Sequence, residues 1–148
     1  MKIVFGDYCE WSKFSLSQDF WIEVGGEAYP SRYWVDLPVV CLGWWLDTYQ
    51  ANVSSKQFFL RFADGRYYFE LIFDDYDKIA VHFYDEGDHE TVRLSTNVKV
   101  KTFERMLIDG ASAVIAKCES IGWEDDDLDK IRDSIGRYRD YGFRRVVT

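Results

Sequence analysis

Long hydrophobic runs are missing from this sequence of 148 residues. The longest apolar stretch, Leu37 to Leu46, is far shorter than the roughly 20 residues that a membrane-spanning helix needs. The N-terminus also lacks a basic segment followed by an apolar run, which is the pattern of a secretory signal peptide. We therefore expect a soluble, cytoplasmic protein that does not bind a membrane.

Cysteine is scarce, and its spacing does not suggest a disulfide framework. Cys9, Cys41 and Cys118 are odd in number, lie far apart and form no C-x-x-C pair. This pattern predicts buried free thiols in a reducing compartment. Linkers rich in Pro, Gly or Ser and internal repeats are also absent, so residues 1–148 are expected to form a single domain.

Motifs that would indicate catalysis are absent as well. The two histidines, His82 and His89, have no Cys or further His at metal-ligand spacing. The sequence contains no nucleophile elbow, phosphate-binding glycine loop or zinc-binding helix motif. We expect no enzyme, no metal and no cofactor. An enzyme of unrecognised type, using His82 with a carboxylate, is the alternative that remains open.

What the sequence does have is an alternating apolar pattern in its centre. Asp64-Gly65 separates two alternating runs, which is typical of a two-residue type I′ hairpin turn. Two more strands follow, one at Ile79 to Phe83 and one at Thr91 to Val100, which gives a four-strand antiparallel meander. The predicted register pairs Phe58 with Leu71, Leu60 with Phe69 and Phe62 with Tyr67, and it turns Ile79, Val81, Phe83, Val92 and Leu94 inward.

The flanking segments complete an α+β fold, in which the antiparallel β-meander packs against about three α-helices. Helix signals include Asp36 as an N-cap, Gly43 at a close helix contact, a Trp44–Trp45 apolar face and Gly122 as a helix stop. The predicted elements are strands at Lys2 to Phe5, Lys13 to Ser17, Phe20 to Val24 and Glu27 to Tyr29, and helices from Asp36, over residues 103–121 and from Leu128 to Tyr138.

Negative charge is concentrated in one segment. The formal net charge is −8, and residues 63–90 hold nine acidic residues against Arg66 and Lys78, a net charge of −7. Such a balance argues against nucleic acid as a partner and favours a basic protein. A solvated set of loops that prevents aggregation is the alternative. The acidic residues lie in two consecutive loops, which a meander places at opposite ends of the sheet or along one edge: Asp74, Asp75, Asp77, Asp85, Glu86, Asp88 and Glu90.

Alternation also puts Phe59, Tyr68, Ile72, His82 and Tyr84 on the face of the meander opposite the core. So many rings indicate that the N-terminal strands or a helix cover this face, or that it is a contact surface. The predicted partner-binding residues are the seven loop acids together with Tyr68, His82 and Tyr84.

The segment from Trp34 to Leu46 (WVDLPVVCLGWWL), in a small acidic chain with 6 Trp, resembles immunity proteins of bacterial polymorphic-toxin and contact-dependent growth inhibition systems. This resemblance implies a cytoplasmic antitoxin that binds and neutralises a cognate toxin domain, often a nuclease with a basic surface. It assigns no role to single residues. The alternative is a ligand-binding or sensor domain with an aromatic pocket that holds Trp44, Trp45 or Trp21.

Overall fold

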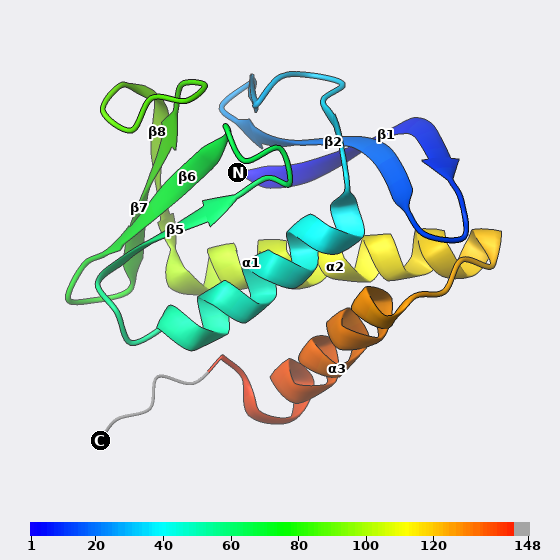
Figure 1. The fold of residues 1–148 in the computed structure, drawn as a ribbon. Helices are drawn as coiled ribbons and strands as arrows, with labels where there is room; N and C mark the ends of the chain where they lie inside the picture. Colours follow the sequence, from blue (N-terminus) through cyan, green and yellow to red (C-terminus); the bar gives the residue numbers. More distant parts are fainter. Residues whose placement is uncertain (144–148) are drawn as a thin grey trace.

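The computed structural model describes residues 1–143 and contains, within them, two antiparallel sheets and three helices, so the predicted α+β class is confirmed (Figure 1). Sheet A comprises β1 (Lys2–Trp11), β2 (Leu16–Val24), β3 (Glu27–Tyr29) and β4 (Val35–Asp36). Sheet B comprises β5 (Gln57–Arg61), β6 (Tyr68–Phe73), β7 (Lys78–Tyr84) and β8 (Val92–Lys99). The helices are α1 (Pro38–Asn52), α2 (Val100–Ile121) and α3 (Asp126–Tyr141).

Both sheets pack against the helices, and one continuous cluster of buried side chains fills the space between them. Trp45 on α1 is fully buried at the centre of this cluster. Its ring contacts Phe20 of sheet A and Phe62 and Phe69 at the hairpin of sheet B. A second link joins the sheets, because the Tyr29 hydroxyl lies 2.9 Å from the carbonyl oxygen of Tyr68 and 2.8 Å from that of Tyr84.

The cysteine spacing predicted free thiols, and the hydropathy predicted no membrane-spanning segment. All three cysteines are free thiols, as predicted, and Cys41 and Cys118 are buried, whereas Cys9 is only partly buried. Across residues 1–143, no helix combines the length and apolarity that crossing a membrane requires.

The β-meander of sheet B has the predicted order and register. Phe58 pairs with Leu71 and Leu60 pairs with Phe69, because alternation fixes which side chains face the core. The predicted type I′ turn is wrong, since neither Asp64 nor Gly65 has the positive φ that this turn requires. The Asp64 carboxylate instead accepts hydrogen bonds from the backbone N–H and the guanidinium of Arg66 and holds a longer loop.

Two other predictions about strands are corrected. The predicted strand from Lys13 to Ser17 begins too early, because the Ser12 N–H bonds to the Ser15 carbonyl at 2.8 Å and closes a turn between β1 and β2. Only Leu16 and Ser17 of that segment are in a strand, as the first two residues of β2. Phe14 is therefore exposed. Val92 is also exposed rather than inward, since the pairing of β7 with β8 shifts register between Phe83 and Tyr84.

The helices begin and end close to the predicted residues, with corrections on α1. Asp36 is the last residue of β4 and not the N-cap, which is Leu37. Gly43 has ordinary space around it, because a β-carbon there would lie 3.8 Å from its nearest neighbour, Ile131. Trp44 is 46% exposed, so it does not share the buried face of Trp45.

The close glycine contact lies instead in β1. A β-carbon at Gly6 would sit 1.9 Å from the buried carboxylate of Asp19. That carboxylate accepts a hydrogen bond from the Tyr8 N–H at 3.0 Å, where the pairing of β1 with β2 is interrupted. At the other end of the chain, Gly122 stops α2 in the left-handed conformation (φ 71°), as predicted.

Candidate functional site

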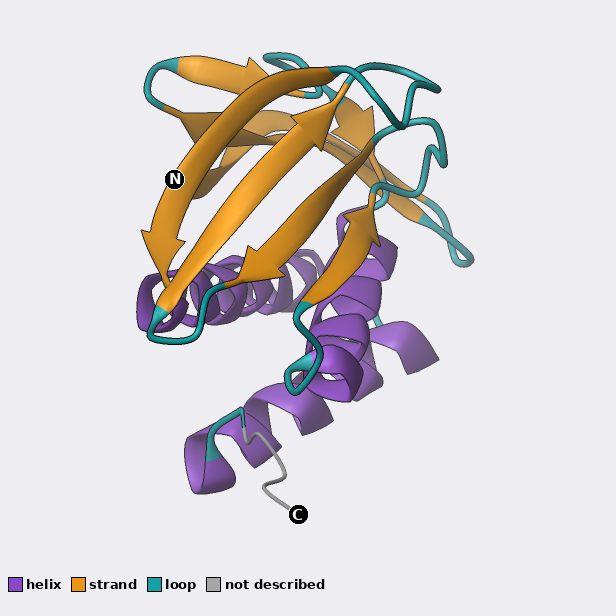
Figure 2. Cartoon of the chain, turned by 90° about the vertical axis from the view of Figure 1, so that its left-hand side faces the viewer, coloured by secondary structure: helices purple, strands orange, loops and turns teal. Residues whose placement is uncertain are grey.

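The face of sheet B that points away from the core is open. Figure 2 looks onto this face and shows no helix or strand in front of the four strands, because sheet A lies behind them and the helices lie below. The expectation that the N-terminal strands or a helix cover this face is therefore wrong. We call this surface the outer face of sheet B.

Aromatic rings cluster on the outer face of sheet B. The Phe59 ring lies 5.9 Å from that of Tyr68 and 6.2 Å from that of Tyr84 (centroid to centroid), and the two tyrosine rings stack at 5.8 Å. The tyrosines shield one another and are nearly buried, whereas Phe59 remains 42% exposed. Tyr68 and Tyr84, two of the predicted partner-binding residues, thus lie together beside an exposed ring that is well suited to contact another protein.

A buried carboxylate lies within this ring cluster. Glu70 is only 4% exposed although it belongs to the outer face, between Phe59 of β5 and His82 of β7 in the strand register. The Tyr84 hydroxyl donates to Glu70 Oε1 at 2.8 Å, and the Gln57 side-chain amide donates to Oε2. Burial, and next this bond to Glu70, raise the pKa of Tyr84 to about 12.

His82, the third predicted contact residue of the sheet, is half-exposed beside this carboxylate. Its Nδ1 lies 3.5 Å from Glu70 Oε1. Ser95 of β8 pairs with His82 across the strands, so an acid, a histidine and a serine share one row. The distance of 3.5 Å between His82 and Glu70 is too long for a strong hydrogen bond.

The loop between β7 and β8 (residues 85–91) adjoins the rings. The His89 imidazole stacks on the Tyr68 ring with centroids 4.4 Å apart. Beneath it, the Tyr68 hydroxyl is buried and has no hydrogen-bond partner among the residues that the structure describes. Asp88 holds the loop, because its carboxylate accepts hydrogen bonds from the Thr91 side chain and from the Glu90 and Thr91 N–H groups. The same hydrogen bonds lower the pKa of the Asp88 carboxyl.

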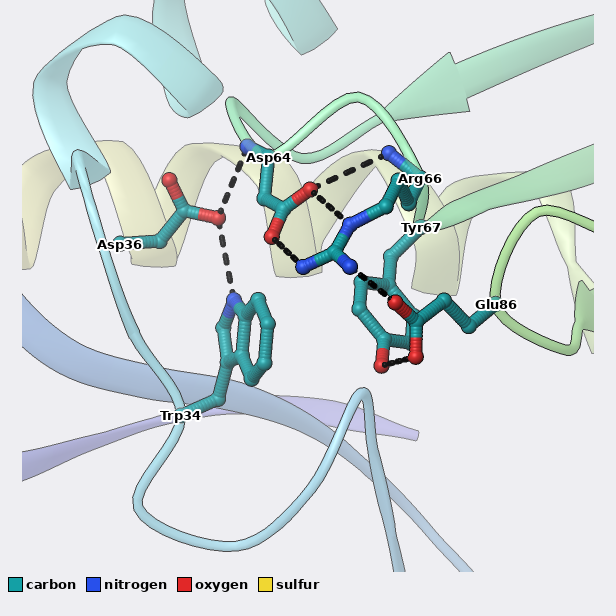
Figure 3. Close-up of polar contacts among 6 residues, drawn as sticks. All are labelled: Trp34, Asp36, Asp64, Arg66, Tyr67 and Glu86. Carbon is teal, nitrogen blue, oxygen red and sulfur yellow. Dashed lines mark hydrogen bonds and ion pairs between the residues drawn. The ribbon is translucent and has the colours of Figure 1, made fainter.

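Glu86 in the same loop is engaged within the protein, as Figure 3 shows. Its carboxylate forms an ion pair with Arg66 and accepts a hydrogen bond from the Tyr67 hydroxyl at 3.1 Å. The Arg66 guanidinium also binds both carboxylate oxygens of Asp64, at 3.1 and 2.9 Å. These contacts fasten the β7–β8 loop to the β5–β6 turn, so Glu86 has a structural role in this loop.

The same network reaches the start of α1. The Trp34 indole N–H donates to Asp36 Oδ2 at 3.0 Å, and the Asp64 N–H points to the same oxygen at 3.5 Å. The Trp34 ring packs edge-on against Tyr67 at 4.8 Å. The segment that carries the immunity-protein resemblance therefore supports the loop beside the outer face of sheet B.

The other predicted acids lie at the far end of the sheet, in the β6–β7 loop of residues 74–77 (Figure 1). Asp74 accepts hydrogen bonds from backbone N–H groups two and four residues further along. Asp75 forms an exposed ion pair with Lys56 at 3.3 Å. The Asp77 carbonyl accepts from the Val100 N–H at the start of α2. The seven acids thus form two separate groups, and only residues 85–90 border the rings.

A groove of about 370 Å³ opens between α1 and β5, next to the outer face of sheet B. The exposed rings of Trp44 and Phe59 both line it, and buried Trp45 contributes to its wall. Trp21, the third tryptophan predicted for a pocket, is not among its lining residues. Nothing in residues 1–143 brings three potential metal ligands together.

The sequence did not indicate Glu70 and Gln57 as members of the site, and it placed Phe59 on the outer face without including it among the predicted partner-binding residues. Glu70 was counted only as one of the nine acidic residues of the segment 63–90. Its place in the sequence between Tyr68 and Ile72 already put it on the face that carries the rings. Comparisons with family models, curated proteins and solved structures give no match for this chain.

Proposed function

We propose that this chain is a non-enzymatic binding protein that docks a basic protein on the outer face of sheet B. The observation that carries the proposal is an uncovered sheet face on which the exposed Phe59 ring lies beside the Glu70 carboxylate. The acidic β7–β8 loop borders these rings through the His89–Tyr68 stack. Exposed rings supply binding energy, while nearby negative charge accelerates association with a positive partner.

The partner in this proposal is a toxin domain. The resemblance of Trp34 to Leu46 to immunity proteins supports that choice, and the net charge of −8 suits a basic toxin such as a nuclease. The inhibitor would act in the bacterial cytoplasm, where free thiols such as Cys9, Cys41 and Cys118 persist.

Two charge-reversal variants test the proposal. Asp85→Lys/Glu90→Lys changes the loop beside the rings, whereas Asp75→Lys/Asp77→Lys makes the same change in charge at the opposite end of the sheet. Glu86 and Asp88 are left intact because they hold the loop, whereas Asp85 forms only a long, half-exposed ion pair of 3.9 Å with Arg93. The partner to use is the C-terminal domain encoded in the reading frame immediately upstream, with association rates measured at low and high salt.

We expect the Asp85/Glu90 variant to associate more slowly and with a weaker salt dependence, and the matched variant to change much less. Wild-type protein should also restore growth to cells that express the upstream domain. Equal association rates for the two variants would refute the docking face. An upstream domain that is neither toxic nor bound would refute the toxin assignment.

A second candidate, binding of a small apolar ligand, is supported by the groove that Trp44 and Phe59 line. A panel of aromatic and aliphatic compounds should then quench tryptophan fluorescence saturably in wild type and not in Trp44→Ala. Lack of saturable quenching across the panel would remove this candidate.

A further inference from the structure

Glu70 is a buried carboxylate without a strong positive partner. Among the described residues, the basic group within 4 Å of it is His82, and no Lys or Arg pairs with it. Burying a carboxylate is costly unless a positive charge or a full set of hydrogen bonds compensates it. The bonds from Tyr84 and Gln57 satisfy one lone pair on each oxygen, and neither donor carries a positive charge.

The surroundings of Glu70 suit a cation that arrives from outside. Phe59, directly opposite Glu70 on β5, is 42% exposed, and the His82 side chain, opposite on β7, is 32% exposed. A cation above the sheet would therefore meet an aromatic face beside a carboxylate, the combination that binds guanidinium and ammonium groups. The chain forms one such contact internally, where the Arg93 guanidinium lies 4.6 Å from the centre of the Tyr29 ring.

A second observation, independent of charge, points to a ligand on the same face. The Tyr68 hydroxyl is buried and has no hydrogen-bond partner in the part of the chain that the structure describes. Its ring stacks on that of Tyr84, which itself bonds to Glu70. Buried polar groups are rarely left unpaired, so this hydroxyl would gain a hydrogen bond where a docking donor displaces the side chains that cover it.

We propose that the outer face of sheet B receives an arginine side chain of the partner, with its guanidinium stacked on Phe59 and hydrogen-bonded to Glu70. Arginine fits better than lysine because its planar, weakly hydrated group stacks on rings and offers several donors at once. This inference rests on the proposed function, since it specifies which chemical group of a basic partner the face recognises.

The test uses the full chain labelled with ¹⁵N and two peptides of equal charge, hexa-arginine and hexa-lysine, followed by NMR. We expect hexa-arginine to shift the Gln57 side-chain amide and the His82 ring signals saturably. Glu70→Gln should weaken this binding at least about tenfold, the loss expected for a hydrogen bond to a charged group. The matched control, Asp75→Asn, removes one negative charge at the far end of the sheet and should bind like wild type.

Each other outcome counts against a defined part of the inference. Equal affinities of Glu70→Gln and Asp75→Asn for hexa-arginine would refute the Glu70 anchor. Equal affinities of wild type for the two peptides would refute the preference for arginine. Shifts confined to residues 85–90 would refute the anchor and leave the docking face standing, whereas shifts in neither region would count against both. Because a glutamine side chain still accepts the Tyr84 hydrogen bond, the backbone spectrum of Glu70→Gln should remain that of a folded chain.

Discussion

The hydroxyl of Tyr84 donates a hydrogen bond of 2.8 Å to the carboxylate of Glu70, from one strand of sheet B to its neighbour. Both side chains are more than nine-tenths buried although they belong to a face that no other element covers. The rings of Phe59 and Tyr68 pack against that of Tyr84, and the Gln57 side chain bonds to Glu70, so neighbouring side chains surround this polar pair.

The first prediction concerns alkaline pH. Because the folded pKa of Tyr84, about 12, lies above the value of about 10 for an exposed phenol, this group stabilises the fold fully below pH 10. The contribution is lost as the pH rises from about 10 towards 12. Glu70→Gln should lower the pKa of Tyr84 but keep it above 10, since burial remains. The ultraviolet absorbance of tyrosinate, with Tyr84→Phe as reference, measures it; an unchanged pKa would contradict the role of Glu70.

The second prediction compares two glycines. Gly43→Ala should stabilise the protein by up to about 1 kcal/mol, because alanine favours a helix and the site has room. Gly6→Ala should destabilise it by about 1–3 kcal/mol, because the new methyl group overlaps the Asp19 carboxylate. Urea denaturation measures both free energies of unfolding. Similar effects of the two changes would mean that β1 adjusts freely around Asp19.

The third prediction orders the thiols by reactivity. Burial raises the pKa of Cys118 to about 11 and that of Cys41 well above its ordinary value, whereas Cys9 is partly exposed and its pKa is raised less strongly. Since the thiolate is the reactive form, iodoacetamide should modify Cys9 first. Mass spectrometry of digested protein reports the order. Simultaneous modification of all three in folded protein would contradict it.

The fourth prediction concerns the β7–β8 loop. Arg66→Ala removes the ion pair with Glu86, so amides of this loop, including that of Gly87, should exchange with solvent faster. Hydrogen bonds from Arg66 also hold the pKa of Asp64 below its ordinary value. That pairing stabilises the fold above the unfolded pKa and is lost as the pH falls, so the variant should be less sensitive to acid.

Arg132→Ala is the matched control for Arg66→Ala, because Arg132 also joins several carboxylates but lies on α3. It should leave exchange in the β7–β8 loop unchanged. Faster loop exchange in both variants would point to general loosening of the fold instead of a local tether.

Structural features that depend on the local sequence pattern could be predicted, whereas features that depend on particular side-chain contacts could not. The register of β5 with β6 followed from alternation, because a slip by one residue would expose Leu60 and Phe69. The prediction of a tight turn between them was wrong, because the Asp64 side chain binds Arg66 and stabilises a longer loop. The early start of the strand predicted over residues 13–17 likewise came from alternation, which the Ser12–Ser15 turn overrides as far as residue 15.

The candidate site shows the same limit. Alternation placed Tyr68, His82 and Tyr84 on the outer face correctly, and the order of the loops separated the two acidic groups. The burial of Glu70 could not be inferred, because it depends on rings that strand pairing brings from β5 and β7. Nor could charge counting reveal that Arg66 engages Glu86.

The position of Tyr29 has a consequence for recognition. Its hydroxyl, which comes from sheet A, holds the backbone carbonyls of Tyr68 and Tyr84 from behind, so the residues that present these two rings are fixed in place before any partner arrives. A surface that is already rigid loses little conformational entropy when it is covered. In the proposed complex, the phenol in the interior would thus lower the entropic cost of docking on the opposite side of the sheet.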